Sequence, residues 1–241
     1  MTALILARFY IRQTMRTKAA LVFGALQPVL FLFLFGPLFA RSGVGSWDVL
    51  VPGLLMQLGL LSAGMSGFGI VFDQRFGVLE RLRVTPAGRV SLLLGRVLKD
   101  ALVLLIQAAG LIALGYALGL RAPLPGVLLG TLLVLLLAIG LASLSYAIAL
   151  TLNQDLFAPI MSTVLVPLLL LSGALLPMTL APAWLDVLSH LTPFRYAVDA
   201  LRALYAGAYT SAPALVGAAV TLAFTVLTLA LATRRFHHEN A

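Results

Sequence analysis

Few residues of this chain could do chemistry, and their spacing argues against catalysis. Ser66 lies in a Gly-x-Ser-Gly pattern of the kind that can present a nucleophile, but a serine nucleophile needs a base beside it, commonly histidine. All three histidines lie outside the apolar stretches of the chain: His190, His237 and His238. The sequence has no cysteine, and neither Lys18 nor Lys99 belongs to a GxxxxGK[ST] phosphate-binding loop. We therefore predict that this chain is not an enzyme and has no catalytic residues, metal site or cofactor of its own.

Six long apolar stretches dominate the sequence. Each has 20 or more residues, which as a helix is long enough to cross a hydrocarbon core about 30 Å thick. They are residues 19–40, 49–72, 101–120, 126–152, 156–176 and 213–232. With 61% hydrophobic and 10% charged residues, the chain is too apolar for a water-soluble fold, in which about 25% of residues are typically charged. We predict an all-α polytopic membrane protein, with one transmembrane domain covering residues 1–241.

The positive charges indicate how the six predicted spans are oriented. Ten of the 16 Lys and Arg residues lie before the first span or between the second and third. This asymmetry predicts both termini in the cytoplasm, because cytoplasmic loops carry the excess of Lys and Arg. The same charges attract anionic lipid headgroups, so a net charge of +8 does not indicate nucleic-acid binding. We predict a multi-pass membrane protein.

Three segments outside the spans have features of their own. Residues 1–18 form a candidate amphipathic helix at the cytoplasmic surface, with Arg8, Arg12 and Arg16 within one arc; a plain topology signal is the alternative. Residues 73–100 combine charged side chains with an apolar stripe, a pattern that suits docking into another protein's groove; a loop that only supplies positive charge for topology is the alternative. Residues 177–212 are apolar but broken by prolines, which predicts re-entrant or interfacial outer helices before the sixth span.

The segment before the sixth span contains a predicted helix with its own ion pairs. Thr192 and Pro193 suit the N-cap and first helical positions. Arg195 would then pair with Asp199, and Asp199 with Arg202. We also expect four aromatic residues to lie at the membrane interface: Trp184, Tyr196, Tyr205 and Tyr209.

Small residues recur every four positions in two of the spans. Gly59, Ala63 and Gly67 do so in the second span, and Ala109, Ala113 and Ala117 in the third. Such spacing lets helix backbones approach closely in lipid. We expect packing within the chain, with a subunit or pathway face as the alternative. No charged side chain lies well inside any span, which disfavours ion-coupled transport.

Two motifs resemble those of the membrane subunit, or permease, of type-2 ABC exporters. The first is Phe76–Pro86 (FGVLERLRVTP), similar to the family's GTLERLxxTP stretch, with Val78 where threonine is common. The second joins Leu171–Pro177 (LSGALLP) to Pro193–Arg202 (PFRYAVDALR), with Thr192 where asparagine is common. In the spacing of its apolar stretches and motifs, essentially the whole chain is similar to this family.

The resemblance implies a set of functional residues. A cytoplasmic helix would couple the chain to an ATPase through Phe76, Gly77, Val78, Leu79, Glu80, Arg81, Leu82, Arg83, Thr85 and Pro86, with Glu80 as its central charge. The outer signature would be Gly173, Pro177, Pro193, Arg195, Tyr196, Asp199 and Arg202. Spans one, two and five would line the substrate path, which places there Gln27, Gln57, Gly59, Ala63, Ser66 and Gly67.

The resemblance also implies partners, a function and a location in the bacterial cell membrane. Two permeases, either two copies of this chain or this chain and a homologue, would face each other in the membrane. Each would be docked on a separate ATPase subunit that binds ATP and Mg²⁺, and the assembly would export drug-like or lipid-like molecules. An ATP-independent or ion-coupled carrier, a scaffold subunit and a polysaccharide exporter are the alternatives.

Overall fold

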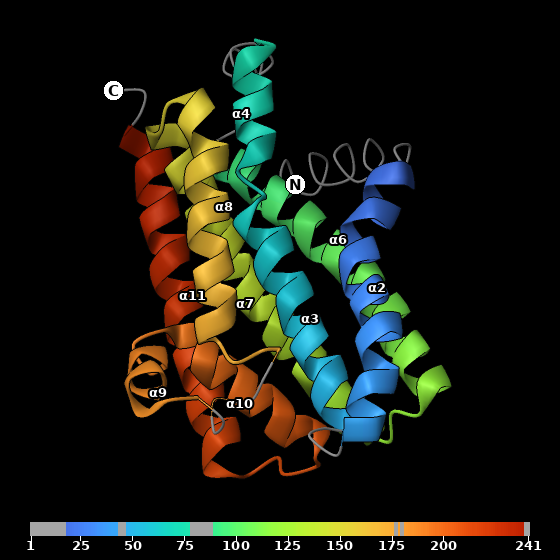
Figure 1. Cartoon of the computed structure of the whole chain (residues 1–241). Coiled ribbons are helices and arrows are strands. Elements are labelled where there is room, and N and C mark those ends of the chain that lie inside the picture. Colours follow the sequence, from blue (N-terminus) through green and yellow to red (C-terminus); the bar gives the residue numbers. More distant parts are fainter. Residues whose placement is uncertain (1–17, 43–46, 78–88, 176–177, 179–180, 239–241) are drawn as a thin grey trace.

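The computed structural model describes residues 18–42, 47–77, 89–175, 178 and 181–238, and in these ranges the chain folds as a bundle of helices (Figure 1). In order these are α2 (Lys18–Ser42), α3 (Trp47–Gly64), α4 (Phe68–Arg75), α6 (Arg89–Leu118), α7 (Leu124–Thr151), α8 (Gln154–Leu171), α9 (Ala183–Ser189), α10 (Pro193–Tyr205) and α11 (Ala212–His238). The all-α prediction is confirmed.

Five helical stretches of the described chain are long and apolar enough to cross a membrane. They are Trp47–Arg75, Leu93–Leu118, Leu124–Thr151, Gln154–Leu171 and Ala212–Arg235. A shorter apolar stretch, Gly24–Leu38, lies within α2. The helices α2 and α11 start and finish, respectively, at the end of the bundle where α4 lies (Figure 1). The count of six spans and the cytoplasmic location of both termini stay predictions.

Three of the predicted spans differ in extent or continuity from the helices of the structure. The second span is interrupted at residues 65–67, so that it consists of α3 and α4. The helix of the third span begins at Arg89, because the apolar pattern continues through the basic residues before it. The fifth span ends at Leu171, because Gly173 adopts a left-handed backbone conformation with a φ angle of 72°, which ends a helix.

The centre of the bundle is α7, which packs against α3, α6, α10 and α11. Its buried positions include small residues, such as Gly126, Gly130 and Gly140, that let neighbouring helices approach its backbone. The short helix α10 lies across the long helices at the end of the bundle opposite α4 (Figure 1). We refer below to these two ends as the α4 end and the α10 end.

Candidate functional site

The α4 end carries the start of the predicted coupling segment. Phe76 follows the last residue of α4 and is 72% exposed, and Gly77 adopts a left-handed conformation with φ of 64°. The rest of the predicted coupling set lies outside the described residues: Val78, Leu79, Glu80, Arg81, Leu82, Arg83, Thr85 and Pro86. The same holds for Arg8, Arg12 and Arg16 of the N-terminal helix and for Pro177.

Ion pairs fasten α4 to two neighbouring helices. Arg75 of α4 pairs with Asp155 at the start of α8. Asp73 of α4 pairs with Arg96 of α6, whose side chain is buried. Because buried charges are costly unless they are paired, the Asp73–Arg96 contact fixes the position of α4 more strongly than the exposed Arg75–Asp155 pair does. From the sequence, these arginines were interpreted only as signals of membrane orientation. The available clue to their pairing was that acidic residues, Asp73 and Asp155, also lie close to helix ends.

A second polar group at this end joins α6 to α7. Lys99 contacts Asp100 across 2.6 Å, and the hydroxyl of Tyr146 on α7 donates a hydrogen bond to Asp100. Tyr146 is 1% exposed. The polar contacts at the α4 end thus connect α4, α6, α7 and α8.

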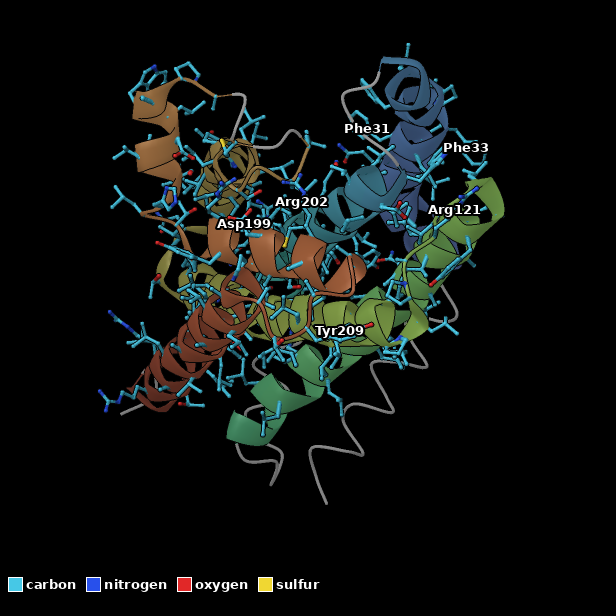
Figure 2. The ribbon with its side chains drawn as sticks, turned by 90° about the horizontal axis from the view of Figure 1, so that it is seen from below. Phe31, Phe33, Arg121, Asp199, Arg202 and Tyr209 are labelled. Carbon is cyan, nitrogen blue, oxygen red and sulfur yellow. The ribbon has the colours of Figure 1, made fainter. Side chains whose placement is uncertain are left out.

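The second motif assembles at the α10 end. Gly173 turns the chain after α8, and its carbonyl oxygen accepts a hydrogen bond of 2.8 Å from Nη2 of Arg202 on α10. The same nitrogen donates to the carbonyl of Ala174 at 3.2 Å. Figure 2 shows Arg202 and Asp199 near the middle of this end of the molecule, between α8 and α7. The structure therefore brings together two stretches of the motif that are 29 residues apart in the sequence.

The predicted ion pairs on α10 are partly confirmed. Nε of Arg195 lies 3.1 Å from Oδ2 of Asp199, as predicted. The predicted Asp199–Arg202 pair was wrong in its geometry, because Arg202 reaches the backbone carbonyls instead. Arg195 also lies 3.7 Å from Oδ1 of Asp186 on α9, where His190 is a further neighbour. Thr192 occupies the N-cap position, but its hydroxyl donates to the carbonyl of Ser189 rather than capping α10.

Burial controls the electrostatics of this group. Desolvation raises the pKa of Asp199, although Arg195 and Arg202 oppose the increase. Desolvation also lowers the pKa of Arg202, and Asp199 opposes that decrease. Burial therefore disfavours the charged form of each group, and the opposite charge of the other offsets part of this effect.

Glycines allow α10 to lie against the backbone of its neighbours. A Cβ atom at Gly126 of α7 would lie 2.0 Å from the carbonyl oxygen of Leu204, and one at Gly217 of α11 would lie 2.3 Å from that of Tyr196. The aromatic ring of Tyr205 packs over Gly130 of α7 and is 2% exposed. The ring of Tyr205 therefore fills the contact between α10 and α7, and its position at the membrane interface stays a prediction.

The predicted path residues lie in different environments. Gln27 is exposed on α2, whereas Gln57, Gly59, Ala63 and Gly67 are buried in helix packing and Ser66 is half-buried. The side-chain oxygen of Gln57 has no hydrogen-bond partner among the described residues. Ala63 lines a cavity with room for about one water molecule. In this chain the set does not surround one cavity, and its role in a path stays a prediction.

The two stripes of small residues behave differently. The stripe on α3 packs inside the chain, as expected: a Cβ atom at Gly59 would lie 2.7 Å from Val134 of α7. The stripe on α6 was wrongly expected to pack in the same way, because Ala109, Ala113 and Ala117 are exposed. Ala113 lines a groove of about 590 Å³ between α2 and α6, whose walls are apolar apart from Gln107. No group of three metal-ligating side chains lies among the described residues.

Comparison with known proteins decides the family. A family profile described as ABC-2 type transporter matches residues 2–206. The chain belongs to the ABC-2 type transporter family. It is 32% identical over 204 residues to the transport permease ycf38 of Porphyra purpurea, and 30% identical to that of Cyanophora paradoxa, covering 80% of this chain and 70% of each relative. It is also 28% identical over 191 residues to the daunorubicin resistance ABC transporter permease protein DrrB1 of Streptomyces coeruleorubidus, covering 76% of this chain and 67% of that protein.

Because the chain belongs to the ABC-2 family, both motifs can be interpreted as parts of one permease. The chain is a multi-pass membrane protein and the permease of an ABC transporter. ABC-2 permeases work with ATPase subunits in general, so the chain's own lack of a phosphate-binding loop agrees with its family. The α4 end, with the first motif, and the α10 end, with the second, are the two regions from which a function can be argued.

Proposed function

We propose that this ABC-2 permease forms the membrane path of an exporter that moves hydrophobic or amphipathic molecules outward, driven by two separate ATPase subunits. One observation carries the proposal: the helix that leads into the first motif is joined by ion pairs to α6 through Asp73–Arg96 and to α8 through Arg75–Asp155. A partner that moves residues 78–88 would therefore move several membrane helices with them. A second permease, a copy or a homologue, would complete the path.

The class of substrate is argued from the surfaces between the helices. The grooves between α2 and α6 and between α6 and α7, of about 590 and 450 Å³, are lined by apolar side chains apart from Gln107. Neither offers the charged or aromatic groups that would favour a polysaccharide. The printed name of the Streptomyces relative refers to daunorubicin resistance, which supports a drug-like molecule as the first substrate to test.

Coexpression with any ATPase subunit encoded beside the gene tests the proposal. We expect one ATPase to copurify with the chain, and inverted membrane vesicles containing both to accumulate a fluorescent amphipathic drug only when ATP is present. Glu80→Ala and Leu82→Asp should reduce this accumulation while the chain still inserts. Accumulation without ATP would favour the ion-coupled or passive carrier, and a copurifying ATPase with no transport of any substrate class would favour the scaffold subunit.

A further inference from the structure

The second membrane span of this permease is interrupted in a particular way. A continuous helix would carry hydrogen bonds from Gly67 N–H to the carbonyl of Ala63 and from Phe68 N–H to that of Gly64. Instead Ser66 N–H bonds to the carbonyl of Ala63, and Phe68 N–H to that of Met65. These tighter turns leave the carbonyl of Gly64 and the N–H of Gly67 without partners inside the helix.

A single side chain of α7 satisfies both groups. The hydroxyl of Ser145 donates a hydrogen bond of 2.5 Å to the carbonyl of Gly64 and accepts one of 3.0 Å from the N–H of Gly67. Ser145 is completely buried. Since unpaired buried backbone groups are costly, this hydroxyl stabilises the interruption and ties it to α7.

Close packing on α7 and α8 reinforces the bond. A Cβ atom at Gly67 would lie 2.5 Å from the carbonyl oxygen of Ser145 and 2.5 Å from the ring of Phe157 on α8. The ring of Phe157 also meets that of Phe68 edge to face, with centroids 5.5 Å apart. Beyond the interruption, α4 therefore packs on α7 and α8 (Figure 1).

We propose that Ser145 is a positioning residue that makes α4 move with α7 and α8 rather than as an extension of α3. This deepens, and rests on, the proposed function. Movement of residues 78–88 would pass through α4 to Ser145 and to the start of α8, and the interruption would leave α3 free to keep its own position. Without the hydroxyl, α4 would be less firmly held, and ATP hydrolysis would continue with less transport.

The chain offers a matched control for each variant. Ser143 is also buried on α7, but its hydroxyl bonds only within α7, to the carbonyl of Ile139. Gly69 lies two residues from Gly67, and a Cβ atom there would meet only Arg96, at an ordinary 3.6 Å. Ser145→Ala and Gly67→Ala should therefore disturb the contact, whereas Ser143→Ala and Gly69→Ala should not.

The first experiment measures ATP-driven transport and ATP hydrolysis at equal amounts of assembled complex. We expect Ser145→Ala and Gly67→Ala to lower the amount transported per ATP hydrolysed by about tenfold, the scale of a lost buried hydrogen bond, with Ser143→Ala and Gly69→Ala near the wild type. A merely structural role would lower the amount of complex but leave this ratio unchanged. An unchanged ratio in both test variants would overturn the proposal.

The second experiment does not need an ATPase. Because the chain has no cysteine, spin labels can be attached through Phe76→Cys, beyond α4, and Leu128→Cys, on the exposed surface of α7. We expect Ser145→Ala to broaden or shift the distance distribution between the labels, and Ser143→Ala to leave it as in the wild type. The same distribution in all three would refute the role of Ser145. If wild-type vesicles show no ATP-driven transport, the proposed function fails, while this measurement still decides whether Ser145 holds α4.

Discussion

Replacing Arg202 tests whether the second motif of this permease stabilises the fold at the α10 end. Its guanidinium joins α10 to the turn after α8 through the carbonyls of Gly173 and Ala174, at 2.8 and 3.2 Å. Arg202→Met keeps much of the apolar length of the side chain but removes both hydrogen bonds. It also leaves two carbonyl groups of buried residues without their donor.

The expected loss of stability follows from these contacts. Hydrogen bonds from charged donors contribute about 1.5–3 kcal/mol each, and because both come from one nitrogen we take about 3 kcal/mol for the pair. In a chain of this size, that free energy corresponds to a decrease in Tm of about 6–12 °C. Burial lowers the pKa of Arg202, which shows that its charge is held at a cost, and methionine avoids that cost. We therefore expect the lower value, about 6 °C.

Thermal unfolding in detergent, followed by the fluorescence of Trp47 and Trp184, measures this change. The control is Arg121→Met, because Arg121 is exposed at the periphery of the same end (Figure 2). Arg202→Lys keeps the charge and one donor group, so its Tm should lie between those of the wild type and Arg202→Met. We expect Arg121→Met to change Tm by no more than about 1 °C. If Arg202→Met has an equally small effect, the hydrogen bonds of Arg202 do not stabilise the fold.

Three further predictions concern the same end of the molecule. Burial raises the pKa of Asp199 above its unfolded value, so the charged form costs stability above the folded pKa and this cost disappears as the pH falls. As the pH falls through the folded pKa, the Tm of the wild type should therefore rise relative to that of Asp199→Asn, and the opposite trend would contradict the direction of the shift. Gly217→Ala should lower Tm by several degrees because its Cβ would meet the carbonyl of Tyr196 at 2.3 Å, while Gly110→Ala, with open space around it, should not; equal melting would refute the packing argument. Gly173→Ala should lower the free energy of unfolding by about 1–2 kcal/mol because Gly173 has a left-handed backbone conformation. Gly173→Asn should lower it less, and urea unfolding of the two variants measures the difference.

The composition and the lengths of the apolar stretches were sufficient to predict an all-α fold. Their boundaries depended on local backbone chemistry that hydropathy does not report. The end of α8 depends on the φ angle of Gly173, and the start of α6 on how far a helix extends through charged residues into water. The interruption at residues 65–67 depends on Ser145, which is about 80 residues away in the sequence.

The functional regions were predictable where the partners lie close in the sequence. The Arg195–Asp199 pair follows from helical spacing, and the structure contains it. The contact of Arg202 with Gly173 and the pairing of Asp73 with Arg96 join different helices, so no spacing rule reports them. Motif resemblance placed Gly173 and Arg202 in one signature, but the reason that they belong together is the hydrogen bond between them.

The most direct test of the account is the side of the membrane to which residues 78–88 are exposed. The absence of native cysteines allows Arg81→Cys and, as the opposite control, Arg121→Cys to be labelled with a membrane-impermeant maleimide. We predict that Arg81→Cys is labelled in inverted vesicles but not in intact cells, and that a bound ATPase protects it. Labelling of Arg81→Cys in intact cells would contradict a segment that receives the work of ATP hydrolysis on the cytoplasmic side.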